Sequence, residues 1–332
     1  MSDRSNFSVD RLVVGTLIGG DAKAPSPGND FYVDGTYGSD GNDATEKSPF
    51  KSFKAAYAQM LTLKNDRMFI YPGSSSLSLA ATTTSTTGTY PDITKSLCSF
   101  IGTSSQKMAQ RSRIGMSTTF TPMLKVSGYG NTFANLYFMH GTATTDYVGI
   151  QVTGNYNSFY NCHIATPLFA ALGDQSSYIG LSIVATGTYF KECVIGMNII
   201  ARTGAYPTVF INAPSTHYGY TRFDDCTFLM QGNTAPFHFS IDNTGADQDE
   251  TYVEFNRCRF ISTGQNMPAG PTYSFSFTAT AAAGCTCGVF LDPNCQFVNC
   301  GLTTANNYAN LWVPTAAKTA AGVTSALVAA IE

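Results

Sequence analysis

Three acidic residues near the middle of the chain have the types and spacing that glycan hydrolysis uses. Glu192 lies in the six-residue phrase Phe190–Ile195, and Asp224 and Asp225 lie in a second copy of that phrase, Phe223–Phe228. If the copies stack like β-strands, Glu192 and Asp225 would lie roughly 5 Å apart, near the carboxylate separation of a retaining glycosidase. These three residues are therefore the catalytic candidates of the sequence.

A structural interpretation of the same acids competes with the catalytic one. The residue before Cys or Leu is polar in every copy of the phrase: Asn135, Asn161, Glu192, Asp225, Arg257 and Asn299. Asn and Asp tolerate the left-handed backbone of a sharp bend, and stacked Asn side chains hydrogen-bond to one another. Arg257 would also neutralise a neighbouring acid, which opposes a raised carboxyl pKa. We favour the structural column and keep the catalytic pair as the alternative.

The phrase itself is the main organising feature of the sequence. It reads aromatic, two mostly polar residues, Cys or Leu, any residue, then a large apolar residue. Its copies begin at Phe133, Phe159, Phe190, Phe223, Phe255 and Phe297, and from Leu136 through Cys162, Cys193, Cys226, Cys258 and Cys300 the steps are 26, 31, 33, 32 and 42 residues. Self-similarity at this period indicates a repeat architecture.

Each repeat holds short apolar strands separated by polar, Gly- and Asn-bearing bends, with no helix between them. This pattern predicts a coil of a parallel β-helix and disfavours a leucine-rich horseshoe. Equivalent positions would form columns about 4.8 Å apart, with the Phe and Cys residues inside the core. We therefore expect the nine cysteines to be reduced and used mainly for packing.

Composition excludes several kinds of partner. The 332 residues are 43% hydrophobic but only 12% charged, with a net charge of −3 and no basic stripe, so we expect no nucleic-acid partner. We find no apolar run of about 20 residues for a membrane span and no signal peptide, so we expect synthesis in a host cytoplasm.

The N-terminal block carries a resemblance. It consists of the strand Phe31–Val33, a Gly/Asp turn cluster, a helix predicted over about 49–64 with Ser48 as N-cap, and the strand Met68–Tyr71 before Pro72-Gly73. This order resembles the entry of the pectate-lyase-like superfamily of right-handed parallel β-helices, whose helix covers the open end of the solenoid. The resemblance implies an all-β fold, a single right-handed parallel β-helix over 30–311 with an N-terminal capping helix.

Two segments flank the predicted solenoid. Residues 1–29 form an N-terminal arm, and 312–332 form an apolar C-terminal tail with almost no charge. Exposed aliphatic side chains without a partner are unfavourable, so we favour an arm that docks on another subunit over a mobile arm. The tail is expected to be either a subunit contact or a short end-capping helix or strand. The expected contact residues are Leu12, Val13, Val14, Leu17, Ile18, Trp312, Leu327 and Val328.

Metal and cofactor sites are not expected. The loop acids Asp242, Asp247, Asp249 and Glu250 match no standard calcium loop, and the late cysteines Cys285, Cys287, Cys295 and Cys300 lack the usual zinc spacing. The four histidines are scattered singly, and His163 is expected to face outward.

These features resemble bacteriophage virion proteins, in which β-helices often form trimers. The leading expectation is a non-enzymatic virion structural protein (a capsid decoration, head-fibre or tail component) that binds other virion proteins through its arm or tail, and a host glycan is a further candidate partner. The alternative is a polysaccharide-degrading tail spike, or a β-helix glycan lyase or hydrolase. A bacterial adhesin would need a secretion signal.

Overall fold

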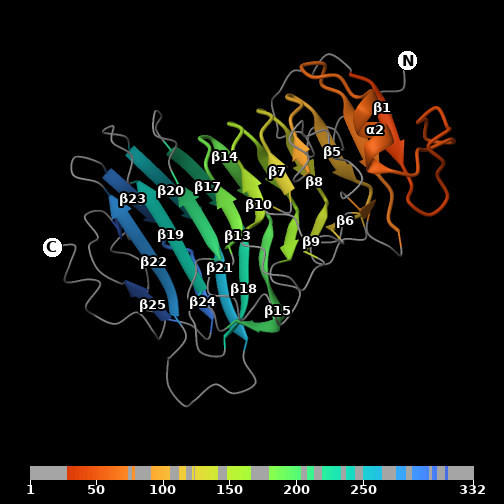
Figure 1. Ribbon diagram of the computed structural model, residues 1–332. Coiled ribbons are helices and arrows are strands. Elements are labelled where there is room, and N and C mark those ends of the chain that lie inside the picture. The colour runs from red at the N-terminus through yellow and green to blue at the C-terminus, as the bar shows by residue number, and fades with distance from the viewer. Residues whose placement is uncertain are drawn as a thin grey trace, which may run out of the picture.

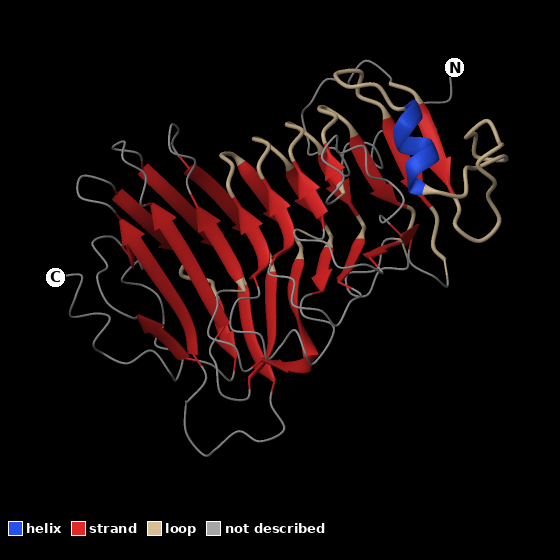
Figure 2. Cartoon of the chain, in the orientation of Figure 1, coloured by secondary structure: helices blue, strands red, loops and turns tan. Residues whose placement is uncertain are grey.

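The computed structural model describes residues 28–73, 77–78, 91–104, 112–116, 122, 124–140, 148–165, 179–202, 208–212, 219–232, 237–243, 250–263, 274–281, 286–298, 301–304 and 311–312. β-strands dominate these residues, and one short helix lies at the N-terminal end of the strand stack (Figure 2). Among the residues described, no helix has the length and apolar character needed to cross a bilayer.

The strands form three parallel sheets, which we call A, B and C in the order in which each coil visits them. Sheet A contains β1 (Asp30–Val33), β2 (Arg67–Ile70), β5 (Ser99–Gly102), β8 (Thr132–Ala134), β11 (Ser158–Tyr160), β14 (Thr188–Lys191), β17 (Gly219–Asp224), β20 (Glu250–Asn256), β23 (Thr286–Leu291) and β26 (Leu311–Trp312). Sheet B contains β3 (Leu77–Ser78), β6 (Arg113–Met116), β9 (Tyr137–His140), β12 (His163–Ala165), β15 (Val194–Arg202), β18 (Thr227–Gly232), β21 (Arg259–Thr263) and β24 (Gln296–Val298). Sheet C contains β4 (Asp92–Ile93), β7 (Leu124–Val126), β10 (Val148–Val152), β13 (Ile179–Ile183), β16 (Val209–Asn212), β19 (Phe237–Asn243), β22 (Ser274–Ala281) and β25 (Gly301–Thr304).

Each coil contributes a strand to every sheet and pairs with the coils before and after it, so the coils stack in chain order from red to blue in Figure 1. The fold is the predicted right-handed parallel β-helix, with the handedness that parallel crossovers adopt.

A stack of phenylalanines runs through the core beneath sheet A. The rings of Phe100, Phe133, Phe159, Phe190, Phe223 and Phe255 follow one another on consecutive coils, with centroids 4.8–5.1 Å apart and nearly parallel planes. All six side chains are fully buried. The prediction that the aromatic of the phrase points inward and stacks on its neighbours is confirmed for the five copies from Phe133 to Phe255.

A second inward column is formed by the thiols. Cys193 Sγ donates to the carbonyl of Phe159, one coil earlier, at 3.3 Å, and Cys226 and Cys258 repeat this bond to Phe190 and Phe223 at 3.5 and 3.3 Å. The conserved geometry explains why one phrase position holds so many free cysteines. A small buried side chain with a weak donor fills the corner and satisfies a core carbonyl.

The bend between aromatic and Cys has a left-handed backbone. Asn135, Asn161, Glu192, Asp225 and Arg257 all have positive φ, between 47° and 56°. Asn161 Nδ2 also donates to Asn135 Oδ1 at 2.8 Å, so the predicted hydrogen bonding between stacked Asn side chains occurs. The polar column of the phrase is therefore chiefly a corner.

A second left-handed column precedes the strands of sheet A. Here Leu97, Gly130, Tyr156 and Gly187 follow one another, with φ of 55°, 65°, 61° and 69°. Bulky residues alternate with glycine for a steric reason. A Cβ on Gly130 would lie 2.5 Å from Leu97 Cδ2, and one on Gly187 would lie 2.4 Å from Tyr156 Cδ1.

The predicted capping helix is present but shorter than expected. It spans α2 (Phe53–Gln59), and Ser52 is its N-cap, with Oγ accepting from Ala55 N, so the assignment of 49–64 with Ser48 as N-cap is wrong at both ends. Phe50 instead pairs with β1, its N–H donating to Tyr32 O. At the other end, the Asp66 carboxylate accepts the N–H of Leu61, which lies just past the helix.

The helix covers the N-terminal end of the phenylalanine stack, as predicted. Phe53 lies 5.7 Å from Phe100 between ring centroids and is nearly parallel to it. Tyr57 is buried beside it, and its hydroxyl accepts the N–H groups of Thr94 and Lys95. Leu61 lies within the predicted helix limits, but it is 54% exposed because the helix has already ended.

The last copy of the phrase was assigned wrongly from the sequence. Cys295, and not Cys300, occupies the thiol column, because its Sγ donates to Phe255 O at 3.3 Å and Phe260 pairs with Phe297. Leu291 takes the aromatic position opposite Phe255. The turn between Leu291 and Cys295 is one residue longer than the turns of the other copies, so this copy does not match the sequence pattern of the phrase.

The phenylalanine stack predicts a gradient of stability. We expect Phe223→Ala to lower the free energy of unfolding by about 3–5 kcal/mol, because it opens a cavity between two stacked rings. Phe297→Ala is the matched control, since this ring is only half-buried at the end of its own stack. Urea titrations followed by circular dichroism measure both, and equal losses would contradict the central role of the sheet A stack.

Candidate functional site

The three sequence-predicted acids occupy two different environments. Glu192 and Asp225 lie in the left-handed corner column on neighbouring coils, where the N–H of Glu192 donates to Asp224 O at 2.9 Å. Arg257, on the next coil, binds both carboxylate oxygens of Asp225 at 2.8 and 2.7 Å. These hydrogen bonds lower the pKa of Asp225, so the expectation that Arg257 neutralises this acid is confirmed.

Asp224 points the other way, onto the outer face of sheet A, and is nearly buried there. Its side chain is 8% exposed. It accepts hydrogen bonds from the hydroxyl of Tyr189 at 2.7 Å, from Arg222 Nε at 2.9 Å and from Asn256 Nδ2 at 2.9 Å. Burial alone would raise the pKa of Asp224, but the three donors outweigh it and lower that pKa. The carboxylate is held ionised, which is unsuited to a general acid.

The network continues onto β20 through Glu254. Its Oε1 accepts from Asn256 Nδ2 at 2.8 Å, its Oε2 accepts from the Tyr220 hydroxyl, and Arg222 Nη1 lies 3.8 Å from Oε2. Burial and the Glu254 carboxylate together raise the pKa of Tyr220 to about 12, while the bond to Asp224 raises the pKa of Arg222. Burial and the hydrogen bond to Asp224 likewise raise the pKa of Tyr189. At neutral pH Tyr189 and Tyr220 therefore keep their hydroxyl protons.

These residues lie beside a groove on sheet A. A cavity of about 400 Å³ is lined by Gly187, Thr188, Tyr189, Tyr220, Arg222 and Asp224, on β14, β17 and the turn before β14. In Figure 1 these strands lie side by side near the middle of the stack. Five members of this network (Tyr189, Tyr220, Arg222, Glu254 and Asn256) were missed from the sequence.

A sequence signal for the missed residues does exist. On β17, Tyr220, Arg222 and Asp224 alternate with the buried Thr221 and Phe223. On β20, Tyr252, Glu254 and Asn256 alternate in the same way. Period-two alternation ahead of the phrase places these polar side chains in adjacent columns on the outer face.

The expectation that His163 faces outward to the surface is wrong. Its side chain points away from the main core, but it is only 2% exposed and packs against Tyr137, with ring centroids 4.8 Å apart. Its Nε2 lies 3.0 Å from Gly196 O. Burial lowers the pKa of His163 to about 4, so the ring is neutral at pH 7 and Nε2 is the donor to this carbonyl.

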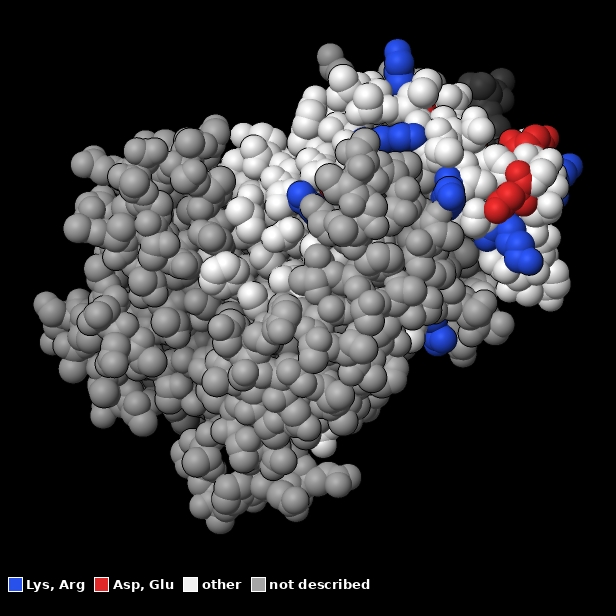
Figure 3. All heavy atoms as spheres, in the orientation of Figure 1, with Lys and Arg blue, Asp and Glu red and all other residues white. Residues whose placement is uncertain are grey.

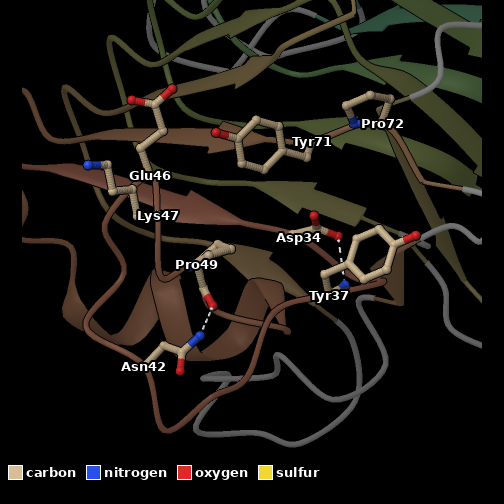
Figure 4. Close-up of a pocket in the computed structure, with 8 residues that line it drawn as sticks. All are labelled: Asp34, Tyr37, Asn42, Glu46, Lys47, Pro49, Tyr71 and Pro72. Atoms are coloured by element: carbon tan, nitrogen blue, oxygen red, sulfur yellow. Dashed lines mark hydrogen bonds between the residues drawn. The ribbon is translucent and has the colours of Figure 1, made fainter.

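A second cavity lies at the N-terminal end and is shown in Figure 4. Its volume is about 500 Å³, and Asp34, Tyr37, Asn42, Glu46, Lys47, Pro49, Tyr71 and Pro72 line it. Its polar groups brace the turns around it, since Asp34 Oδ1 accepts the N–H of Tyr37 at 3.0 Å and Asn42 Nδ2 donates to Pro49 O at 2.8 Å. The face seen in Figure 3 gathers its described charged side chains at this same end.

No metal centre is formed by the part of the chain that the structure describes, in which no group of three His, Cys, Asp or Glu residues is placed to hold an ion. Asp40, from the acidic turn cluster, caps the helix entry by accepting from Lys51 N and Ser52 N at 3.0 and 2.8 Å. Asp247, Asp249, Cys285 and Cys300 lie outside the described residues, as do the expected contacts Leu12, Val13, Val14, Leu17, Ile18, Leu327 and Val328. Trp312 belongs to β26, opposite Phe290 on β23, so the solenoid includes this residue.

Comparison with known proteins identifies the fold. Neither a family model nor a curated protein matches the chain. Among solved structures, the pectin methylesterase of Aspergillus niger in a penultimately deglycosylated form gives a TM-score of 0.52 at 13% identity, covering 93% of this chain and 96% of that chain. Its deglycosylated form gives a TM-score of 0.50 at 11% identity over the same shares. The chain shares the parallel β-helix of these enzymes, and identities this low show the fold alone.

Asp224 predicts a specific acid sensitivity. Because its folded pKa lies below the unfolded value of about 3.8, its contribution to stability is present above that pH and is lost as the pH falls through the folded pKa. We expect Asp224→Asn to lose about 1–3 kcal/mol at pH 7 and to show a flatter decline below pH 4. Asp225→Asn, at an exposed ion pair, should lose less than about 1 kcal/mol. Urea unfolding at several pH values measures this, and indistinguishable variants would contradict it.

The buried His163 predicts a second pH dependence of stability, at less acidic pH than that of Asp224. The unfolded chain protonates this ring near pH 6.5, whereas the folded protein does so only near pH 4, so stability is full above 6.5 and declines toward 4. The loss amounts to at most roughly 3 kcal/mol. In His163→Gln this slope between pH 6.5 and 4 should disappear while the slope below pH 4 remains. A variant with the wild-type slope would show that another group causes it.

Proposed function

We propose that this chain is a non-enzymatic bacteriophage virion structural protein, a capsid decoration, head-fibre or tail component whose β-helix projects from the particle. One observation carries the proposal most. β1 and β26 lie at opposite ends of the ten-stranded sheet A, so the N-terminal arm and the C-terminal tail join opposite ends of a rigid rod. At roughly 4.8 Å per strand, the sheet alone separates those ends by about 40 Å.

The state of the acids supports the non-enzymatic part of the proposal. Asp225 is bound by Arg257, and Asp224 is bound by Tyr189, Arg222 and Asn256. A glycosidase needs one carboxyl with a raised pKa to protonate the leaving group, and both of these acids have lowered pKa values. In this proposal both aspartates act as structural anions that hold neighbouring coils together.

The arm and tail supply the proposed attachments. An arm with Leu12, Val13, Val14, Leu17 and Ile18 needs a partner surface to cover its aliphatic side chains. We assign that surface to other virion proteins or to the equivalent arms of a homotrimer. At the opposite end we propose Trp312 of β26, with Leu327 and Val328 of the tail, as the contacts. In this proposal the protein is a component of the virion.

An antibody against the purified chain tests the proposal. We expect it to label intact phage particles in immuno-electron microscopy, and mass spectrometry of purified particles to detect the chain. A chain lacking residues 1–27 should fold with the same circular dichroism spectrum but should not join the particles, because its attachment is gone. Multi-angle light scattering should give three times the chain mass of 35.5 kDa for the full protein.

Two results would overturn the proposal. Particles free of the chain would remove the virion role. Release of reducing ends or unsaturated products from host polysaccharide, lost in Glu192→Gln, Asp224→Asn or Asp225→Asn with folding retained, would establish the competing polysaccharide-degrading spike.

A further inference from the structure

The groove on sheet A has features that its structural role does not require. The corner acids already hold the coil together, yet a separate network of six side chains is assembled on the outer face. Its members are Tyr189, Tyr220, Arg222, Asp224, Glu254 and Asn256, on three adjacent strands. A face needed only for solubility has no use for so many mutual hydrogen bonds, whereas a binding surface gains from side chains that are already fixed.

The charges in the groove balance. Arg222 faces Asp224 and Glu254, and Lys191 lies opposite Asp224 on the neighbouring strand, which gives two cations and two anions. Asp225 and Arg257 on the adjacent corner cancel each other. An anionic ligand would meet two fixed carboxylates, and a cationic one would meet Arg222. The electrostatics therefore favour an uncharged ligand.

The polar side chains place a hydrogen-bond donor beside an acceptor, a pattern that suits the hydroxyl groups of a ligand. The Arg222 side chain is 41% exposed and that of Glu254 is 29% exposed, and they stand 3.8 Å apart between Nη1 and Oε2. Planar donors and acceptors side by side can exchange hydrogen bonds with a pair of vicinal hydroxyls. Each side chain is also held by a second partner, Arg222 by Asp224 and Glu254 by Tyr220. Ligand binding would therefore cost little side-chain conformational entropy.

Aromatic faces border these polar groups. Tyr220 is 38% exposed and lines the groove. Tyr156 is 63% exposed, and its ring lies directly over Gly187, which also lines the cavity. Amphipathic rings that offer a flat apolar surface beside polar groups suit the C–H faces of a sugar ring.

We propose that this groove is a binding site for a neutral oligosaccharide, with Tyr220 and Tyr156 against sugar faces and Arg222 and Glu254 bound to hydroxyls. The biological use of the site, as a contact with a host glycan, rests on the proposed virion function, whereas the binding itself does not.

Isothermal titration calorimetry of the full chain tests the site with three probes: mannohexaose, cellohexaose and hexagalacturonate. We expect at least one of the two neutral hexasaccharides to bind and the uronate to bind at least about tenfold more weakly. Tyr220→Ala should weaken the neutral ligand about tenfold through loss of the ring, and Tyr220→Phe should weaken it less. Tyr129→Ala is the matched control, an exposed tyrosine outside the groove, and should bind like wild type.

Several outcomes would overturn the site. These are no heat of binding with either neutral hexasaccharide at millimolar concentration, tighter binding of the uronate, or equal losses in Tyr220→Ala and Tyr129→Ala. Circular dichroism of each variant separates loss of binding from loss of folding. Chromatography of the incubated sugars separates the two proposals. Sugar that binds and stays intact supports both the binding site and the non-enzymatic function. Sugar that binds and is cleaved refutes the non-enzymatic function but not the binding site.

Discussion

In five successive coils the chain turns a sharp corner at the same place, and a left-handed residue between the inward aromatic and the inward Leu or Cys makes that turn. Asn135, Asn161, Glu192, Asp225 and Arg257 all adopt this conformation, although only the Asn and Asp residues do so at low cost. The turn brings both the ring and the thiol to the inside, which simple strand alternation would forbid. The phenylalanine stack and the thiol-to-carbonyl bonds then repay its strain on each coil. In-register stacking and the closed core both depend on this one corner.

The same alignment orders the outside of the molecule. Residues at one position of successive coils form a column on the outer face, and a side chain there has neighbours only about 4.8 Å above and below. Acids in such a column repel one another unless a cation or donor lies within reach. Here Arg257 stands above Asp225, and Tyr189 and Asn256 flank Asp224. Asp225, one half of the pair that looks catalytic along the sequence, is therefore neutralised in space by Arg257. The polar network around Asp224 lies beside the groove on sheet A.

Much of the fold follows from the sequence, because a repeated phrase reports a repeated environment. The inward Phe and Cys, the left-handed corner and the Asp225–Arg257 contact were all predictable from it. The helix limits were not, since Asp40 and Asp66 lie outside the helix and accept backbone N–H groups at its two ends. The last copy of the phrase was not recognised because it has one additional residue before Cys295. This insertion changes the sequence pattern but keeps the register of the strands. The groove was missed because its residues come from three coils, each of which shows only ordinary strand alternation.

The alternation of Leu97, Gly130, Tyr156 and Gly187 bears on how such a chain can lengthen or shorten over evolutionary time. Each bulky side chain occupies the space left by the glycine of the following coil. A single coil duplicated or deleted within this region would set two bulky residues or two glycines against each other, giving either a clash or a gap. A pair of coils would keep the pattern intact. Over these four coils the steric pattern therefore repeats every two coils, twice the period that the repeated phrase suggests.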